Sequence, residues 1–268
     1  MFLEKNSNKK LSDKEKEAIE IIRKYAPKEE IYYLAYSGGK DSDVLLHLAR
    51  RAGVNFQAIH NFTTIETREQ IKHVRKQKNV KIIYPAKTFY QLVEEKGLPT
   101  MMKRWCCKSL KHYYGKGKLT MTGVRKEESV ARGKRALEYI EYGGKKKDTK
   151  IRSVLPIVNF TEKDIWDYIE KYDIETCKLY KMGYKRVGCV GCPLSPKKQR
   201  ERGYANYPNM KTAIEKSFDK YNARSKEKGS RLLFKNGEEA VKWWLSGLSV
   251  KAWNFKNKGE LKFGVEKD

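Results

Sequence analysis

The stretch Ile31-Tyr-Tyr-Leu-Ala-Tyr-Ser-Gly-Gly-Lys-Asp-Ser42 joins an apolar run to a glycine loop and decides the fold. Residues 31–36 are typical of a buried strand, and a helix rich in leucine and valine is expected after the loop. Glycines between a strand and a helix let the main chain approach a ligand, and the start of the helix presents free N–H groups to an anion. The stretch therefore predicts a phosphate-binding loop in an α/β protein.

The residue types in this loop suit phosphate chemistry. Ser37 and Ser42 offer hydroxyl donors, and Lys40 offers a point charge for a phosphoryl oxygen. The loop is not a Walker loop, because Gly-Lys followed by Ser or Thr does not occur in the chain. A tight turn without a ligand is the alternative, but the strand before the loop and the helix after it favour phosphate binding.

Strands and helices are expected to alternate along much of the chain. Short apolar runs indicate buried strands, and apolar residues at three- and four-residue spacing indicate helices. Such alternation predicts a Rossmann-like parallel sheet flanked by helices. The strands are expected at residues 56–60, 80–84 and 119–123, and the helices at 66–77, 88–96 and 161–171, the last of them capped by Thr161.

Three stretches of different character are expected. Residues 1–29 carry a helix that should begin at the capping box Ser12-Asp-Lys-Glu15. Residues 30–195 are predicted to form the nucleotide-binding α/β domain, which includes the cysteine-rich segments described below. Residues 196–268 are predicted to form a basic helical extension.

The composition excludes several classes of protein. The 268 residues carry a formal net charge of +26, and 12% of them are aromatic, which is too many for a disordered polycation. The mean hydropathy is −0.80, and no apolar run approaches the ~18 residues of a membrane span. Residues 1–10 lack the apolar core of a secretory signal, so a cytoplasmic location without membrane contact is expected.

The positive charge is concentrated in one block. Residues 101–150 hold 15 Lys and Arg against 5 Asp and Glu, whereas residues 1–50 hold 10 against 9. A basic block attracts phosphates, either on a nucleotide or along a nucleic-acid backbone. A solvated basic surface is the alternative reading of the total charge. Because this block coincides with other chemical signals, a nucleic acid is an expected partner.

Five cysteines point to metal or redox chemistry. An odd number in a chain without a signal peptide argues against a disulfide framework. Cys189 and Cys192 have the C-x-x-C spacing that directs two thiolates at one metal. Because neighbouring side chains diverge, the adjacent Cys106 and Cys107 suit the separate corners of a [4Fe–4S] cluster better than one zinc ion, which stays the alternative. Cys177 is expected to be a packing residue.

Further motifs follow the glycine loop in order. They are Thr63-Thr-Ile-Glu66, Cys106-Cys107, Thr122-Gly-Val-Arg125 with Ser129 and Arg132 after it, Thr161-Glu-Lys-Asp-Ile-Trp166, and Leu179-Tyr-Lys-Met-Gly-Tyr-Lys-Arg-Val-Gly-Cys-Val-Gly-Cys-Pro193. Together they resemble the phosphoadenosine phosphosulfate reductase family of the adenine-nucleotide alpha-hydrolase, or N-type ATP pyrophosphatase, superfamily. The resemblance implies an enzyme that splits ATP between its α and β phosphates, transfers AMP to an acceptor and releases pyrophosphate.

The resemblance also implies a role for each matching residue. The pyrophosphate would be held by Ser37, Gly38, Gly39, Lys40, Asp41 and Ser42. The catalytic residues would be Lys40, Asp41 and Arg125, with Asp41 also helping to position Mg²⁺. The nucleotide would further contact His60, Arg125, Ser129 and Arg132. The ligands of a [4Fe–4S] cluster would be Cys106, Cys107, Cys189 and Cys192.

Two departures separate the chain from the reductases of that family. Sulfonucleotide reductases attack the sulfate group with a cysteine on a C-terminal segment, whereas the last cysteine here is Cys192. Their phosphate loop is usually degenerate, whereas Lys40 and both serines are kept here. Both departures favour an ATP-using relative, similar to the sulfur-transfer proteins of DNA phosphorothioation or to the tRNA-thiolating enzymes.

The expected function is that of an ATP-dependent adenylylating iron–sulfur sulfurtransferase acting on a nucleic acid or another anionic acceptor. Its sulfur would come from a partner such as a cysteine desulfurase, or from the cluster, which could instead be structural or electron-carrying. One alternative is a reductase of phosphoadenosine or adenylyl sulfate. Another is a zinc-containing nucleic-acid-binding module without catalysis.

Overall fold

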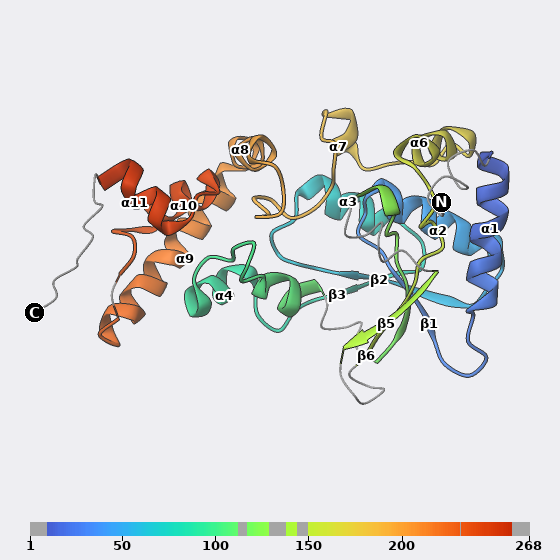
Figure 1. Cartoon of the computed structure of the whole chain (residues 1–268), viewed down its shortest axis with the longest axis horizontal. Coiled ribbons are helices and arrows are strands. Elements are labelled where there is room, and N and C mark those ends of the chain that lie inside the picture. Colours follow the sequence, from blue (N-terminus) through green and yellow to red (C-terminus); the bar gives the residue numbers. More distant parts are fainter. Residues whose placement is uncertain (1–9, 112–116, 129–137, 144–149, 231, 259–268) are drawn as a thin grey trace, which may run out of the picture. The chain divides into compact units, whose positions relative to one another are not determined.

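The computed structural model of the chain describes residues 10–111, 117–128, 138–143, 150–230 and 232–258 (Figure 1). The chain divides into two compact units. The first unit comprises Met1–Pro85 and Ser109–Gly188, and the second comprises Ala86–Lys108 and Cys189–Asp268. No helix of the described ranges combines the length and the apolar character that crossing a membrane requires.

The first unit is built around a six-stranded sheet with the strand order β3-β2-β1-β4-β6-β5. Neighbouring strands are parallel, except that β5 and β6 pair antiparallel. This mostly parallel sheet with its flanking helices confirms the predicted Rossmann-like α/β fold. The strands are β1 (Tyr32–Ala35), β2 (Phe56–Asn61), β3 (Val80–Ile83), β4 (Leu119–Met121), β5 (Tyr139–Gly143) and β6 (Lys150–Val154).

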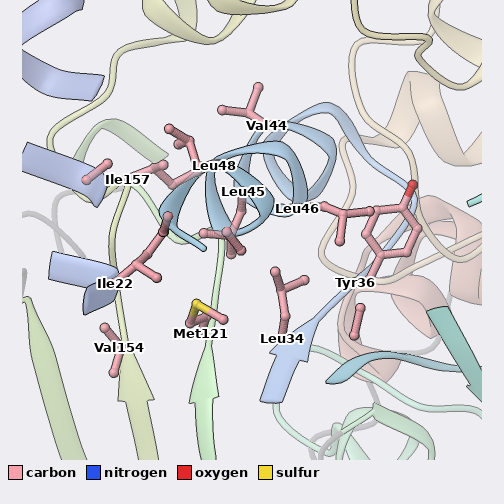
Figure 2. Packing of buried hydrophobic residues seen from close by; sticks show 14 of the residues in the cluster. Ile22, Leu34, Tyr36, Val44, Leu45, Leu46, Leu48, Met121, Val154 and Ile157 are labelled. Carbon is pink, nitrogen blue, oxygen red and sulfur yellow. The ribbon is translucent and has the colours of Figure 1, made fainter. Parts of the chain in front are cut away.

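Four helices, α1, α2, α3 and α6, share a buried apolar cluster with this sheet. In Figure 2, Leu45 of α2 lies among Met121 of β4, Leu34 of β1 and Ile22 of α1. A fully buried leucine contributes roughly 1.5–3 kcal/mol, so this packing fixes α2, and with it the preceding glycine loop, at the end of β1. The helices of the first unit are α1 (Leu11–Lys24), α2 (Lys40–Ala52), α3 (Arg68–Lys76), α6 (Glu162–Lys171) and α7 (Lys178–Lys181), with a 3₁₀ turn at Lys126–Glu128.

The sequence predicts two helix starts from capping residues, and the structure confirms one of them. The predicted capping box at Ser12 is wrong, because α1 begins at Leu11 and its N-cap is Lys10, which makes no side-chain cap. Leu11 packs against the apolar core, and this contact favours the earlier start. Thr161, by contrast, caps α6 as predicted, its hydroxyl accepting a hydrogen bond from the main-chain N–H of Asp164.

The sequence patterns did not indicate β5 and β6. Charged residues interrupt both strands, as in Glu141 and Lys150, which form an ion pair across the antiparallel register. Interrupted apolar runs of five residues carry too weak a periodicity to predict a strand. Pairing with β4 in the assembled sheet, through Leu119 opposite Arg152, defines β6 instead.

The second unit is helical and includes the predicted C-terminal helices. Helix α4 packs against α9, which in turn packs against α10. The indole N–H of the buried Trp244 donates to the carbonyl oxygen of Pro99, tying α10 to the chain after α4. The helices are α4 (Phe89–Lys96), α8 (Lys197–Asn206), α9 (Pro208–Glu227), α10 (Gly237–Ser246) and α11 (Val250–Lys258), and a π-helical segment covers Cys107–Lys111 at the junction with the first unit.

The two units group the chain differently from the three stretches set out from the sequence. Residues 86–108 connect β3 to β4 along the chain but belong with the C-terminal helices. The reason is that α4 buries Phe89, Leu92 and Val93 in that unit. Consequently both cysteine pairs, 106/107 and 189/192, lie in the second unit, whereas the glycine loop lies in the first.

Candidate functional site

The glycine loop turns from β1 into α2 and is held by its own hydroxyl groups. Ser42 Oγ accepts from the main-chain N–H of Ser37 and of Gly39 at 3.2 and 3.1 Å, and it donates to the Gly39 carbonyl at 2.7 Å. The side-chain amide of Gln70, on α3, donates to the Ser37 carbonyl at 2.9 Å. Hydrogen bonds within the protein therefore hold the loop in its conformation.

Gly38 stands where a side chain would interfere, whereas a Cβ on Gly39 would make ordinary contact with its neighbours. Gly38 has a φ of +75°, and a Cβ there would lie 2.8 Å from Val74 Cγ2. A Cβ on Gly39 would lie 3.4 Å from the hydroxyl of Tyr180, and that hydroxyl accepts from the main-chain N–H of Lys40 at 2.9 Å. An oxygen acceptor therefore already meets the N-terminus of α2, the position at which a helix binds an anion.

A cavity of about 350 Å³ opens at the carboxyl ends of β1, β2 and β4. Ligands of parallel α/β sheets bind at such strand ends. Of the residues predicted to bind nucleotide, those lining this cavity are Ser37, Gly39, Asp41, Ser42 and His60. Ser129 and Arg132 lie outside the described residues.

Lys40 and Arg125, the two cationic residues predicted to be catalytic, are held in an ion-pair cluster. Lys40 Nζ, on a side chain only 6% exposed, lies 3.4 Å from a carboxylate oxygen of Asp41 and 3.4 Å from one of Glu162. Arg125 directs its guanidinium to Asp41 at 2.6 Å, and to Glu127 and Glu162 at 2.8 Å each. Burial lowers the pKa of Arg125, but these carboxylates outweigh that effect and raise it overall. The cluster gathers both side chains beside the loop.

His60 is buried at the end of β2 between two fixed acceptors. Its Nδ1 lies 2.9 Å from the Tyr36 carbonyl, and its Nε2 lies 3.1 Å from a Glu66 carboxylate oxygen. Because a carbonyl only accepts, Nδ1 carries a proton. Thr63 donates its hydroxyl to the other Glu66 oxygen at 3.0 Å. The imidazole is thus fixed in orientation at the cavity wall.

A second buried array lies where α2 and α3 meet. The hydroxyl of Tyr36 and Nε2 of His73 both contact one carboxylate oxygen of Asp43, at 2.5 and 2.9 Å. Burial raises the pKa of Asp43, although the His73 and Tyr36 hydrogen bonds act in the opposite direction. This array binds α3 to α2 behind the phosphate loop.

The four cysteines predicted as metal ligands are partly buried in the second unit and form no disulfide. The pKa of Cys106 is raised, first by its hydrogen bond with Cys107 and by burial, and further by the charges of Cys107, Cys189 and Cys192. The two cysteine pairs therefore lie close enough to influence one another. Among the described residues, no three His, Cys, Asp or Glu side chains converge tightly enough to hold a single metal ion.

The surroundings of these thiols fit an anionic sulfur-rich group. Buried donors without a hydrogen-bond partner in this unit include the indole N–H of Trp105, next to Cys106, and the hydroxyl of Tyr204. Sulfur atoms of a thiolate-ligated cluster accept hydrogen bonds from such donors. Cys177 is separate, fully buried in an apolar cluster of the first unit with Leu179, Tyr184 and Val187.

Comparison with known proteins identifies the family. The sequence profile of the phosphoadenosine phosphosulfate reductase domain matches residues 31–195, more than half of the chain. The chain belongs to the phosphoadenosine phosphosulfate reductase domain family. The matched range runs from the first residue before β1 to just beyond Cys192, so it includes the glycine loop and both cysteine pairs.

Curated relatives of this reductase-domain protein include named enzymes. An uncharacterized protein of Methanocaldococcus jannaschii is 31% identical over 78% of this chain and 53% of its own length. The sulfate adenylyltransferase subunit 2 of Shewanella amazonensis is 30% identical over 66% of this chain and 69% of its own. An adenosine 5′-phosphosulfate reductase of Staphylococcus saprophyticus is 24% identical over 68% and 79%. The chain spans about half the length of the first of these relatives, 53%, and 43% of a second Methanocaldococcus jannaschii protein.

Two solved structures are similar to this chain at low sequence identity. The phosphoadenylyl-sulfate reductase of Candida auris matches 67% of this chain and 93% of its own, with a TM-score of 0.48 and 16% identity. The U34-tRNA thiolase of Methanococcus maripaludis, solved with its [4Fe–4S] cluster, matches 92% and 89%, with a TM-score of 0.41 and 14% identity.

Sequence reasoning on this family member missed several residues at the loop. Glu162 contacts both Lys40 and Arg125, and Tyr180 meets the first N–H of α2. Gln70 supports the Ser37 carbonyl. Glu162 directly follows the helix cap Thr161, and Tyr180 lies nine residues before Cys189, so both fall inside motifs that the sequence had singled out. Lys40, which both of them contact, however, lies 122 and 140 residues away from them along the chain.

Proposed function

We propose that this protein is an ATP-dependent adenylylating enzyme, an ATP α–β pyrophosphatase that serves sulfur transfer to a nucleic acid or another anionic acceptor. The observation that carries the proposal is the intact loop of Ser37–Ser42, which includes the buried Lys40. A helix N-terminus and two cations are groups that stabilise a departing pyrophosphate. The adenylyl transfer named for the Shewanella amazonensis relative supports the same reaction class.

In the proposed first step, an acceptor oxygen attacks the α-phosphorus of ATP. The bond from that phosphorus to the bridging oxygen breaks, and pyrophosphate leaves with the electron pair. Lys40 and Arg125 would exchange their carboxylate partners Asp41, Glu127 and Glu162 for phosphate oxygens, since both kinds of anion use the same donors. Asp41 would then be free to position Mg²⁺.

In the proposed second step, a sulfide-level sulfur attacks the activated acceptor atom, and AMP leaves. Activation is needed because a bare oxygen is a poor leaving group whereas AMP is a good one. We assign Cys106, Cys107, Cys189 and Cys192 as the ligands of a [4Fe–4S] cluster, which when bound supplies electron or sulfur transfer and joins two distant segments. A cysteine desulfurase is the kind of partner that would deliver the sulfur, as a persulfide whose outer sulfur a thiol reductant would bring to the sulfide level with two electrons.

The test of this function is release of pyrophosphate. We expect Lys40→Ala to lose pyrophosphate release from ATP by at least about 10²-fold, the cost typical of removing one electrostatic stabiliser, and to keep the iron content of the wild type. The assay follows pyrophosphate with wild type and variant protein purified without oxygen. Lys24→Ala is the matched control, because Lys24 is exposed and pairs with Glu138. Normal turnover of Lys40→Ala would refute the role of the loop.

The reductase reading is the second candidate, favoured by the relatives named adenosine 5′-phosphosulfate reductase. It predicts sulfite from adenylyl sulfate, with no pyrophosphate from ATP. A zinc module would instead hold zinc, contain no iron and bind no ATP. Metal analysis, a sulfite assay and the pyrophosphate assay on one oxygen-free preparation separate the three, and sulfite production would overturn our proposal.

A further inference from the structure

The loop between Cys189 and Cys192 is a tight turn. The main-chain N–H of Cys192 donates to the Cys189 carbonyl at 3.3 Å, and Gly191 has a φ of +68°. A Cβ on Gly191 would lie only 2.0 Å from the hydroxyl oxygen of Tyr204. The hydroxyl of Tyr204 therefore rests directly on the backbone that joins the two cysteines.

Tyr204 is rigidly placed there by α8. Gly203, its neighbour on that helix, lies so close to the loop that a Cβ would be 3.2 Å from Val190 Cγ1. Arg200, one turn earlier, is buried and donates to the Trp244 carbonyl at 2.8 Å, which anchors α8 to α10. The Tyr204 ring also packs near Trp244, with the ring centroids 6.2 Å apart. The contacts of α8 with the loop at 189–192 and with α10 therefore fix the position of the Tyr204 hydroxyl.

The hydroxyl of Tyr204 is buried and has no hydrogen-bond partner among the described residues. An unsatisfied buried donor costs roughly 1–3 kcal/mol, so its presence calls for a partner. The tyrosine's electrostatic neighbours include Cys189 and Cys192. A phenol hydroxyl is a hydrogen-bond donor at neutral pH. An acceptor at the two thiolates would complete this site.

We propose that the Tyr204 hydroxyl donates a hydrogen bond to a sulfur of the thiolate-ligated inorganic group that Cys189 and Cys192 hold, and thereby stabilises its reduced state. This inference rests on the proposed function, which places an iron–sulfur cluster on these cysteines. Reduction adds negative charge to the sulfurs, so a hydrogen bond to them favours the reduced form and raises the reduction potential. Gly191 is required because any side chain there would displace the hydroxyl.

The test compares Tyr204→Phe with Tyr32→Phe. Tyr32, on β1 of the first unit, also carries a buried hydroxyl without a hydrogen-bond partner among the described residues, so it matches the chemistry at a site away from the cysteines. For Tyr204→Phe with its cluster, we expect a more negative reduction potential and loss of iron to a chelator faster on the order of tenfold. We also expect the Fe–S stretching bands in the resonance Raman spectrum to shift less in D₂O than those of the wild type. Tyr32→Phe should match the wild type in all three.

Without the metal, the same substitution should not destabilise the protein. Removing an unsatisfied buried hydroxyl leaves the free energy of unfolding unchanged or raised, so metal-free Tyr204→Phe should be at least as stable as metal-free wild type. A variant that binds iron with unchanged potential and unchanged Raman bands would overturn the hydrogen bond while leaving the cluster assignment intact. A wild type that binds zinc or no metal would instead refute the cluster assignment itself.

Discussion

Single residues around the loop are constrained by backbone shape as much as by chemistry. Gly38 combines a left-handed backbone with the close approach of Val74 from α3. Gly53 ends α2 with a similar φ of +69°, but a Cβ there would meet no atom within 4 Å. The two glycines therefore separate the cost of backbone strain from the cost of a steric clash.

We expect Gly38→Ala to abolish tight ATP or pyrophosphate binding, because α3 or the loop must move to admit the new methyl group. Its free energy of unfolding should fall by about 2–4 kcal/mol, the sum of strain and overpacking. Gly53→Ala, the control, should lose only about 1–2 kcal/mol from strain and bind nucleotide normally. Calorimetric titration and denaturant unfolding measure both effects. Normal nucleotide binding by Gly38→Ala would contradict the assignment of the loop.

Among the helices, α1 shows how an element outside the matched family range is fixed to the nucleotide unit. Its Glu15 is buried and accepts from Arg51 of α2, Lys171 of α6 and the Tyr172 hydroxyl. Burial raises the pKa of Glu15, but these three hydrogen bonds lower it more, so the net pKa lies below its ordinary value of 4.5. One carboxylate thus joins three helices that cover the sheet.

We expect Glu15→Gln to lower the free energy of unfolding at pH 7 by about 2 kcal/mol, as for a hydrogen bond to a charged group. Because the folded-state pKa is lowered, this stabilisation is complete above pH 4.5 and declines as the pH falls through the folded-state value. The difference between the proteins should therefore shrink in acid. Denaturant unfolding from pH 7 to pH 3 tests this, with the exposed Glu20→Gln as control. A difference that is constant with pH would show that packing, and not charge, links the helices.

For the whole molecule, the net charge of +26 is the property that bears on a macromolecular partner. A large net charge determines neither the fold of the protein nor the nucleotide sequence that it binds. It does attract polyanions and release their counterions. It therefore supports a nucleic-acid acceptor without identifying one.

We expect the protein to bind duplex or single-stranded nucleic acid with an affinity that falls steeply with salt. If about six to ten phosphates are contacted, the binding constant drops by about 10³–10⁵ between 50 and 200 mM salt. Fluorescence anisotropy of labelled oligonucleotides measures the slope, and ATP binding serves as the comparison at each salt concentration. Affinity that does not change with salt, or no binding at low salt, would exclude an extended nucleic-acid contact.

The sequence by itself determined the parts of this protein that depend on neighbouring residues. The strand–glycine loop–helix at 31–52, the Thr161 cap of α6, and the family carried by residues 31–195 all follow from local patterns. The predicted start of the first helix at Ser12 is wrong, because packing of Leu11 against the core favours an earlier start. A local sequence pattern does not contain that tertiary contact.

Only the tertiary structure decided which distant groups meet. It placed Glu162 against Lys40 and Arg125, and it set Tyr204 of α8 over Gly191. It also assigned residues 86–108, with their cysteines, to the C-terminal helices. The physical reason is that burial and ion pairing act through space between segments that can lie a hundred or more residues apart. Residue periodicity reports only which face of an element is apolar, and not what covers that face.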